Sequence, residues 1–250
     1  TLNHSDGLAR AGKYTTPHGS FKTPAFMACG TKGTVKALDP RDLEIVGAEI
    51  ILANTYHLAL RPGADAVEKL GGLHEWTSWK KPFLTDSGGF QIFSLEKNRR
   101  ITEDGVEFRS PLNGDKHFFT PEKVMQLQEK LGADIIMAFD ECAPGDSSHA
   151  YAKEAMKRTH DWVVRCKKEH EKLQKKRQKD KKSAQALFPI IQGVIFDDLR
   201  VESTQFMANL DLPGIAIGGL SVGESKEDMH RILDAIHPYL PTDKIRYLMG

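Results

Sequence analysis

The sequence places a carboxylate, two glycines and an aromatic ring next to one another after a short apolar run. In the segment TDSGGFQ, residues 85–91, the Asp86 side chain is expected to project from the end of a strand. Gly88 and Gly89 would let the backbone approach a flat ligand, and Phe90 offers a face on which a ring could stack. Asp-Ser-Gly-Gly is also a common turn sequence, so this segment alone leaves a purely structural interpretation open.

Three further apolar runs end in polar or glycine residues. Asp140, followed by Glu141 and Cys142, emerges from the apolar run DIIMAF, where an aspartate is better explained as a ligand group than as a turn residue. Gln192 ends the run FPII and presents a side-chain amide. The loop GGLSVGE, residues 218–224, exposes backbone N–H groups ahead of a helix, although such a loop also suits a phosphate.

Together these strand-end groups are complementary to guanine. The Watson–Crick edge of guanine carries two donors beside the O6 acceptor. A carboxylate can accept from both donors, and an amide or a backbone N–H can donate to O6. Asp140, Gln192 and Gly219 are of the required types, so we expect a guanine-like ring to bind where these strand ends meet.

The polar groups belong to a series of alternating strands and helices. Helix-start signals occur at Asp39-Pro40, Thr120-Pro121 and Ser225, and a long helix is expected from Ser148 to about Lys182. The runs expected to be strands are Pro24–Cys29, Ile50–Asn54, Phe83–Asp86, Asp134–Asp140, Leu187–Gln192, Gly214–Gly219 and Ile245–Met249. This alternation predicts an α/β protein with a parallel sheet and its reactive residues at the carboxyl ends of the strands.

A parallel barrel closes with eight strands, whereas this series has seven. We therefore expect a (β/α)8 TIM-type barrel that is incomplete in this chain, as a single barrel domain over residues 1–250 and a fragment of a longer protein. Two antiparallel hairpins are added to it. Residues 1–23 are expected to cap the mouth of the barrel, and residues 101–120, with Asp104-Gly105 and Asn113-Gly114 as turns, form an inserted hairpin.

Composition limits the class of protein. Lys plus Arg number 35 against 34 for Asp plus Glu, so any RNA contact must come from local patches rather than a general positive field. Three widely spaced cysteines argue against a disulfide framework, and none lies in a C-x-C or C-x-x-C pair, so no four-ligand zinc site can be identified in this chain. No apolar run approaches the roughly 18 residues of a membrane helix. We expect a soluble, cytoplasmic protein with no membrane contact.

Six segments, in order, resemble the signature stretches of bacterial tRNA-guanine transglycosylases: NTYHLALRPG, LTDSGGFQIFSL, FDECAPG, IIQG, GGLSVGE and YLMG. The resemblance implies a pentosyltransferase of queuosine biosynthesis. Such enzymes exchange guanine at the wobble position of tRNAs with a GUN anticodon for preQ1, a 7-aminomethyl-7-deazaguanine. The form FDECAPG, including Cys142, is similar to bacterial members, which favours preQ1 over queuine as the incoming base.

The resemblance also implies roles for individual residues. Asp86 matches the family's proton acceptor, Phe90 and Met249 match the pair that sandwich the purine, and Glu224 matches an acid behind the base-binding backbone. The residues implied in substrate binding are Asp86, Ser87, Gly88, Gly89, Phe90, Asp140, Cys142, Gln192, Gly219, Leu220, Glu224 and Met249.

Displacement at C1′ with retention requires a carboxylate nucleophile that forms a covalent glycosyl intermediate. In the family this nucleophile is an aspartate at the end of strand eight, beyond this chain, so the chain alone is expected to be inactive. A structural zinc site and basic residues that hold the tRNA anticodon arm also lie further on. We therefore expect no metal or cofactor ligated by this chain, and the family implies a homodimer at full length.

Two alternatives remain open. One is a non-catalytic accessory subunit of the same family that binds tRNA or a partner protein. The other is an unrelated barrel enzyme that uses GGLSVGE to hold a phosphate, which would leave the segments DSGGF and FDEC unexplained.

Overall fold

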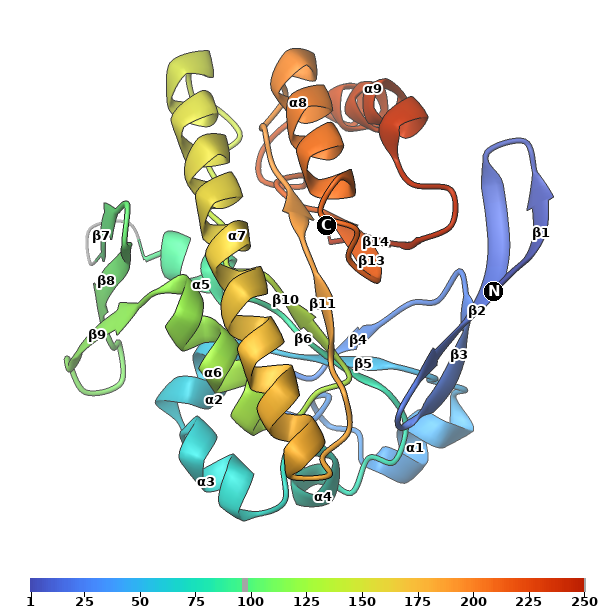
Figure 1. The fold of residues 1–250 in the computed structure, drawn as a ribbon, viewed down its shortest axis with the longest axis vertical. Coiled ribbons are helices and arrows are strands. Elements are labelled where there is room, and N and C mark those ends of the chain that lie inside the picture. Colours follow the sequence, from blue (N-terminus) through green and yellow to red (C-terminus); the bar gives the residue numbers. More distant parts are fainter. Residues whose placement is uncertain (96–98, 250) are drawn as a thin grey trace.

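The structure is a computed structural model that describes residues 1–95 and 99–249, and a series of parallel strands runs through its centre (Figure 1). Gly250, the last residue of the expected domain, lies outside the described residues. In spatial order the strands are β4 (Ala28–Cys29), β5 (Ile51–Ala53), β6 (Phe83–Thr85), β10 (Ile135–Met137) and β11 (Ala186–Phe188), then β12 (Ile190–Ile191), β13 (Gly214–Ile217) and β14 (Ile245–Leu248). Every pairing between neighbours within each of these two sheets is parallel. The predicted α/β fold with a parallel sheet is confirmed.

Each of the seven runs expected to be strands contains at least one of these strands. The run Leu187–Gln192 is divided into β11 and β12 at Pro189, because proline has no N–H to donate to a neighbouring strand. β11 pairs with β10, whereas β12 pairs with β13. This one segment therefore joins the two parallel sheets.

Helices connect the strands and cover their outer face. They are α1 (Pro40–Ile45), α2 (Thr55–Leu60), α3 (Ala64–Lys69), α4 (Leu73–Thr77), α5 (Gly89–Phe93), α6 (Pro121–Leu131), α7 (His149–Lys179), α8 (Asp197–Ala208), α9 (Lys226–Ile236) and the short 3-10 helix η2 (His237–Tyr239). The helix starts predicted at Asp39, Thr120, Ser148 and Ser225 are confirmed, since each of these side chains accepts a hydrogen bond from a backbone N–H of the first turn. Among the described residues, no helix combines the length and apolar character needed to span a membrane.

Alternate strand residues pack into two separate apolar clusters. Ile51, Phe83 and Ile136 pack toward the helices, while their neighbours Leu84 and Ile135 belong to a second cluster on the opposite face of the strands. This is the two-residue period of a strand with both faces buried.

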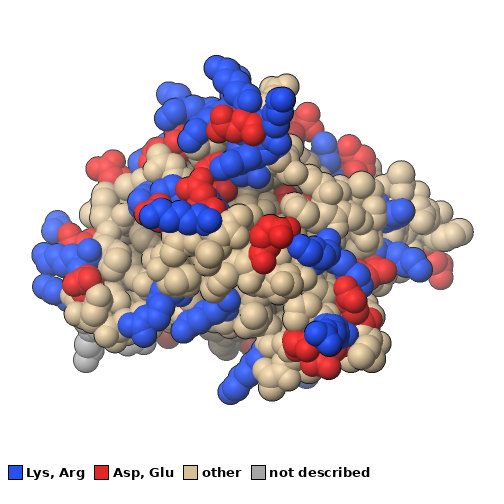
Figure 2. Space-filling view, turned by 90° about the horizontal axis from the view of Figure 1, so that it is seen from below, with Lys and Arg blue, Asp and Glu red and all other residues tan. Residues whose placement is uncertain are grey.

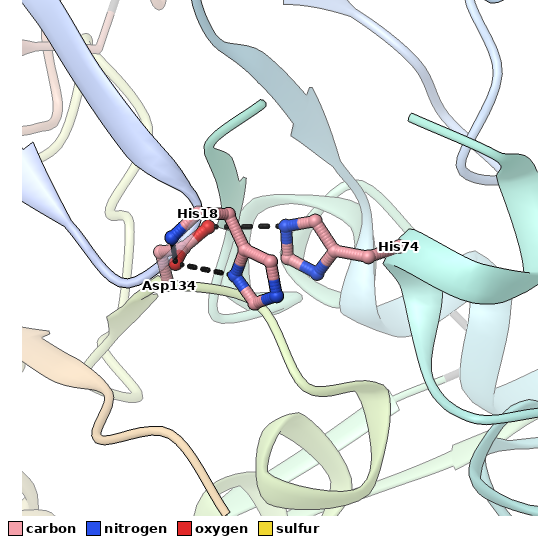
Figure 3. Close-up of side chains that lie close together, drawn as sticks. All are labelled: His18, His74 and Asp134. Carbon is pink, nitrogen blue, oxygen red and sulfur yellow. Dashed lines mark hydrogen bonds and ion pairs between the residues drawn. The ribbon is translucent and has the colours of Figure 1, made fainter. Parts of the chain in front are cut away.

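The N-terminal segment forms three antiparallel strands, β1 (Leu2–Asp6), β2 (Ala9–Thr16) and β3 (Gly19–Thr23). The expected hairpin corresponds to β2 and β3, and Phe21 packs on the inner apolar cluster beside Ile135. The turn between them carries His18, which contacts Asp134, the residue before β10 (Figure 3). The prediction that residues 1–23 cap the mouth is wrong, because this contact places the turn at the end where the strands begin.

The Asp134 carboxylate holds this turn through four donors. Its Oδ1 lies 2.8 Å from His18 Nδ1 and accepts from the His18 backbone N–H at 3.2 Å. Its Oδ2 lies 3.1 Å from His74 Nε2 and accepts from the Phe83 backbone N–H at 3.0 Å. The two imidazole rings stack with centroids 3.4 Å apart (Figure 3). We call His18, His74, Asp134 and the Phe83 amide the Asp134 clamp.

The inserted segment is antiparallel, as predicted, but has one strand more than a hairpin. Its strands β7 (Arg99–Thr102), β8 (Gly105–Arg109) and β9 (Lys116–Phe119) pair in sequence order. It begins at Arg99 rather than at residue 101, and it lies on the opposite side of the molecule from the N-terminal strands (Figure 1).

Candidate active site

A pocket of about 380 Å³ opens where the parallel strands end. It is lined by residues in or shortly after β4, β5, β6, β10, β12, β13 and β14. The residues expected to bind a substrate that line it are Asp86, Ser87, Phe90, Asp140, Cys142, Gln192, Gly219, Leu220 and Met249. The fold therefore brings together polar groups from four separate strand ends.

The two glycines of TDSGGFQ do not line the pocket but allow two strand ends to approach each other. A Cβ on Gly89 would lie 2.7 Å from the Asp140 backbone oxygen and 2.8 Å from Asp140 Oδ1. Gly88 has φ +78°, a left-handed conformation that favours glycine, and it faces Tyr56. Gly89 therefore determines how closely the end of β6 packs on Asp140, and Gly88 determines how closely it packs on Tyr56.

Asp86 is a buried carboxylate held by hydrogen bonds from the junction of β5 and α2 and from its own turn after β6. Oδ1 accepts from the backbone N–H of Thr55 at 2.8 Å and of Gly88 at 3.2 Å, and Oδ2 accepts from the Asn54 side-chain amide. Burial raises the pKa of Asp86 to about 6, although these hydrogen bonds act in the opposite direction. A carboxyl group with such a pKa exchanges protons readily near neutral pH.

Asp140 is a second buried carboxylate, and it joins two other strand ends. Ser87 Oγ donates to Oδ1 at 2.7 Å, and Gln192 Nε2 donates to Oδ2 at 2.7 Å. Burial raises the pKa of Asp140 to about 6 against these hydrogen bonds, and the neighbouring charge of Glu141 adds to the rise. Both donors are rotatable side chains, so they can turn away and leave the carboxylate oxygens to a ligand.

The loop after β13, residues 218–224, carries the backbone groups of the site. The Glu224 carboxylate accepts from the backbone N–H of Val222 at 2.9 Å and from that of Ser221, so it folds the loop back on itself. Glu224 does not line the pocket. Although burial opposes the change, these backbone hydrogen bonds lower the pKa of Glu224 below its usual value.

Comparison with known proteins identifies the family. The family model described as queuine tRNA-ribosyltransferase matches residues 5–250. A protein named queuine tRNA-ribosyltransferase from Herpetosiphon aurantiacus is 58% identical over 250 residues, covering 100% of this chain and 61% of that protein. One of the same name from Desulforamulus reducens is 54% identical over 242 residues, covering 97% of this chain and 63% of that protein.

The chain belongs to the queuine tRNA-ribosyltransferase family. A third relative of that name, from Ruminiclostridium cellulolyticum, is 55% identical over 242 residues, covering 97% of this chain and 62% of that protein. This chain spans about three fifths of the length of the curated relatives it matches.

In this family member an exposed aromatic ring and a thioether line the pocket. Phe90 has 57% of its surface exposed, and Met249, the residue after β14, is partly buried. Burial raises the pKa of the Cys142 thiol to about 12, and the charge of Asp140 adds to this rise. Cys142 therefore stays a neutral thiol at physiological pH and contributes polarisable surface rather than a nucleophile.

Sequence reasoning missed several residues of the site. Asn54 donates to Asp86, and it is the last residue of a predicted strand, so the rule that identified Asp86 and Asp140 applied to it as well. Tyr247 and Cys29 also line the pocket, and burial raises the pKa of the Tyr247 hydroxyl, an effect to which the charge of Asp86 adds. No sequence signal distinguished Arg200, a buried cation behind the pocket.

Among the described residues of this family member, one group could hold a metal ion, namely His18, His74 and Asp134. It lies at the amino end of β10, whereas the pocket lies beyond its carboxyl end. Each Asp134 oxygen already accepts a hydrogen bond from one backbone N–H and contacts one imidazole nitrogen. The group is therefore occupied as a hydrogen-bonded clamp rather than open as a ligand set.

Proposed function

We propose that this protein takes part in base exchange on tRNA, replacing guanine at the wobble position of tRNAs with a GUN anticodon by preQ1. The observation that carries the proposal is the convergence of Asp140, Gln192 and the loop at Gly219 on one pocket. A carboxylate, a side-chain amide and backbone N–H groups match the hydrogen-bonding edge of guanine. Membership of the queuine tRNA-ribosyltransferase family supports the same activity.

Recognition of the base would proceed by exchange of internal hydrogen bonds for bonds to the ligand. The ligand's N1–H and exocyclic amine would donate to Asp140, displacing Ser87 and Gln192 from its oxygens. The freed Gln192 amide and the N–H groups near Gly219 would then donate to the carbonyl oxygen of the base. Phe90 and Met249 would contact the two faces of the ring, where an aromatic ring and a thioether both pack well.

The chemistry would be a double displacement at C1′ of the nucleotide. A carboxylate attacks C1′ as guanine leaves with the bonding electrons, and guanine takes up a proton from the neutral Asp86 carboxyl group, which becomes the carboxylate. The incoming base then attacks C1′, loses its proton to Asp86 and releases the carboxylate. A pKa near 6 suits Asp86 to this exchange, because the group is accessible in both protonation states near neutral pH.

We further propose that the nucleophile is an aspartate on an eighth strand, in the part of the relatives' length that this chain does not span. The same part would hold a structural zinc ion and basic residues that contact the anticodon arm.

The surface charge of this chain is mixed on the face seen in Figure 2. Lys and Arg are interspersed there with Asp and Glu, which agrees with a formal charge of only +1. The full-length protein would work as a homodimer in the cytoplasm.

The test is incorporation of labelled guanine into substrate tRNA by the full-length gene product and, separately, by residues 1–250. We expect label to enter tRNA with the full-length protein and not with residues 1–250. Incorporation by residues 1–250 alone would contradict the proposed position of the nucleophile. A full-length protein that binds tRNA without exchanging its base would instead be the accessory subunit.

A further inference from the structure

Arg200 is a fully buried cation behind the loop at residues 218–224. It lies in the first turn of α8, and none of its surface is exposed. Its guanidinium donates to four backbone carbonyls, those of Val194 at 2.7 Å, Ile191 at 3.3 Å, Gly218 at 2.6 Å and Gly219 at 2.6 Å. Two of these carbonyls flank Gln192 closely in sequence, and the other two open the loop.

Arg200 forms no ion pair with any of the residues that the structure describes. The charge of Glu224 nevertheless acts on it, opposing the effect of burial on its pKa. Burial lowers the pKa of Arg200 to about 10, so the side chain stays charged at neutral pH. A buried charge that forms no ion pair is costly unless hydrogen bonds stabilise it, and for Arg200 these hydrogen bonds go to backbone carbonyls.

The hydrogen bonds to Gly218 and Gly219 determine which way two peptide units face. In a planar trans peptide the C=O and the following N–H point in opposite directions. Both carbonyls are turned toward Arg200, which does not line the pocket, so the N–H groups of Gly219 and Leu220 face away from Arg200. Gly219 and Leu220 themselves line the pocket, and in the described part of the chain neither amide donates to another group.

A glycine pair does not hold this orientation by itself. Gly219 has φ +60°, and glycine rotates between backbone conformations at little cost, so without an anchor these peptides would sample other directions. Arg200 bonds both carbonyls at once through its two Nη groups, a geometry that the single ammonium of lysine does not reproduce. Donation to a carbonyl also polarises the peptide and makes its N–H a stronger donor.

We propose that Arg200 is the positioning residue that aims the N–H groups of Gly219 and Leu220 at the carbonyl oxygen of the substrate base. The inference rests on the proposed function, and it identifies the 6-oxo group of the purine as the feature that Arg200 helps to select. Arg200 acts through the backbone and does not touch the base.

The experiment compares two bases on the full-length protein. Guanine carries the 6-oxo group and an N1–H, whereas 2-aminopurine lacks both and keeps the exocyclic amine. Wild type should therefore bind 2-aminopurine more weakly, and the effect of each Arg200 variant is the change in affinity for each base relative to wild type. For wild type, Arg200→Lys and Arg200→Gln we would measure the Kd of each base, and with labelled guanine the KM and kcat of exchange. Arg231→Lys is the matched control, because Arg231 is exposed on α9 and bonds Asp197 and Asp228 at the surface.

We expect both Arg200 variants to bind guanine on the order of tenfold more weakly, with little change for 2-aminopurine. The ratio of the Kd of 2-aminopurine to the Kd of guanine would then fall. In the exchange reaction KM would rise by a larger factor than kcat falls. Arg231→Lys would behave as wild type in each measurement. An equal loss for both bases, or an unchanged guanine preference in a folded Arg200 variant, would overturn the proposal. A wild type that binds neither base would contradict the proposed function instead.

A measurement on wild type covers the case in which both Arg200 variants fail to fold. Amide hydrogen exchange at Gly219 and Leu220 should be fast in the free protein and at least about tenfold slower with guanine bound. Saturating 2-aminopurine should leave both rates nearly unchanged. Slow exchange in the free protein, or equal protection by the two bases, would show that these N–H groups do not bind the carbonyl oxygen of the base.

Discussion

Two aspartates flank the same strand, β10, and their environments are opposite. Asp134 precedes the strand, and its two oxygens share contacts with two imidazoles and two backbone N–H groups. Asp140 follows the strand, and its contacts are two rotatable side chains, Ser87 and Gln192. Burial alone favours the neutral acid at both ends, but the four contacts of Asp134 lower its pKa, whereas the pKa of Asp140 is raised to about 6.

The difference separates a structural carboxylate from one available to a ligand. Fixed donors stabilise the charged form of Asp134 and leave it no free lone pair, so it holds the N-terminal turn in place. The two side-chain donors of Asp140 offset only part of the cost of burying its charge. A ligand that brings two N–H donors would stabilise this buried charge. Asp86, with its pKa near 6, belongs with Asp140 rather than with Asp134.

The largest effect is expected from Asp86→Asn in the full-length protein. Removing the proton acceptor should lower the rate of guanine exchange on the order of 10³-fold. Binding of the base should change much less, and the protein should stay folded. Unlike the donors around Asp134, the Asn54 side-chain amide can rotate and accept from the new amide nitrogen, while the new amide oxygen still accepts from the backbone N–H groups of Thr55 and Gly88. The assay is labelled guanine incorporation, with Asp65→Asn as the control at an exposed aspartate that pairs with Lys130. Activity within a few-fold of wild type would remove Asp86 from the chemistry.

The next effect is on stability and concerns the other end of β10. Asp134→Asn should lower the free energy of unfolding by about 3 kcal/mol, because the new amide nitrogen faces donors that Asp134 now accepts from. The pKa of Asp134 is lowered in the folded state, so its contribution is complete at pH 7 and is lost as the pH falls below about 3.9. Urea unfolding at pH 7 measures it.

The same variant also tests the comparison itself. Base binding by folded Asp134→Asn protein should match wild type, since the clamp lies away from the pocket. A loss of base affinity without a loss of stability would show that the two ends of β10 are not functionally separate.

A third prediction concerns pH and Asp140. The pKa of Asp140 is raised to about 6, and only the ionised carboxylate accepts from both donors of the base. Guanine affinity should therefore fall about tenfold between pH 7 and pH 5. Asp140→Asn should bind guanine weakly with a flat profile over this range, as measured by titration calorimetry. A wild-type affinity that is constant from pH 7 to pH 5 would contradict the assignment of Asp140 as the acceptor.

The smallest effect is expected from His18→Ala. His18 is the partly exposed member of the clamp, with 34% of its side chain accessible, and its backbone N–H would still donate to Asp134 after the change. The free energy of unfolding should fall by about 1 kcal/mol, less than for the buried His74→Ala. Equal losses in the two variants would show that solvent does not weaken the His18 contact.

Much of the fold was predictable from local pattern. Short apolar runs separated by capped helices indicated parallel strands, and the caps at Asp39, Thr120 and Ser225 are where the pattern placed them. The N-terminal strand β1 was missed, because LNHSD has no apolar alternation and pairs only through its backbone. The end at which the hairpin packs was also wrong, since it depends on a contact between His18 and a residue 116 positions away.

The sequence by itself determined which residue types end the strands and therefore that Asp86, Asp140, Gln192 and the loop at 218–224 meet at one edge of the sheet. Only the tertiary structure decided that the hydrogen-bonding capacity of the Asp134 carboxylate is fully used while that of Asp140 is not. The tertiary structure also decided that Arg200 is buried against backbone carbonyls. The physical reason is that strand direction is a local property of the chain. Hydrogen-bond saturation depends on donors such as His74 and the Phe83 amide, which only folding brings to the carboxylate.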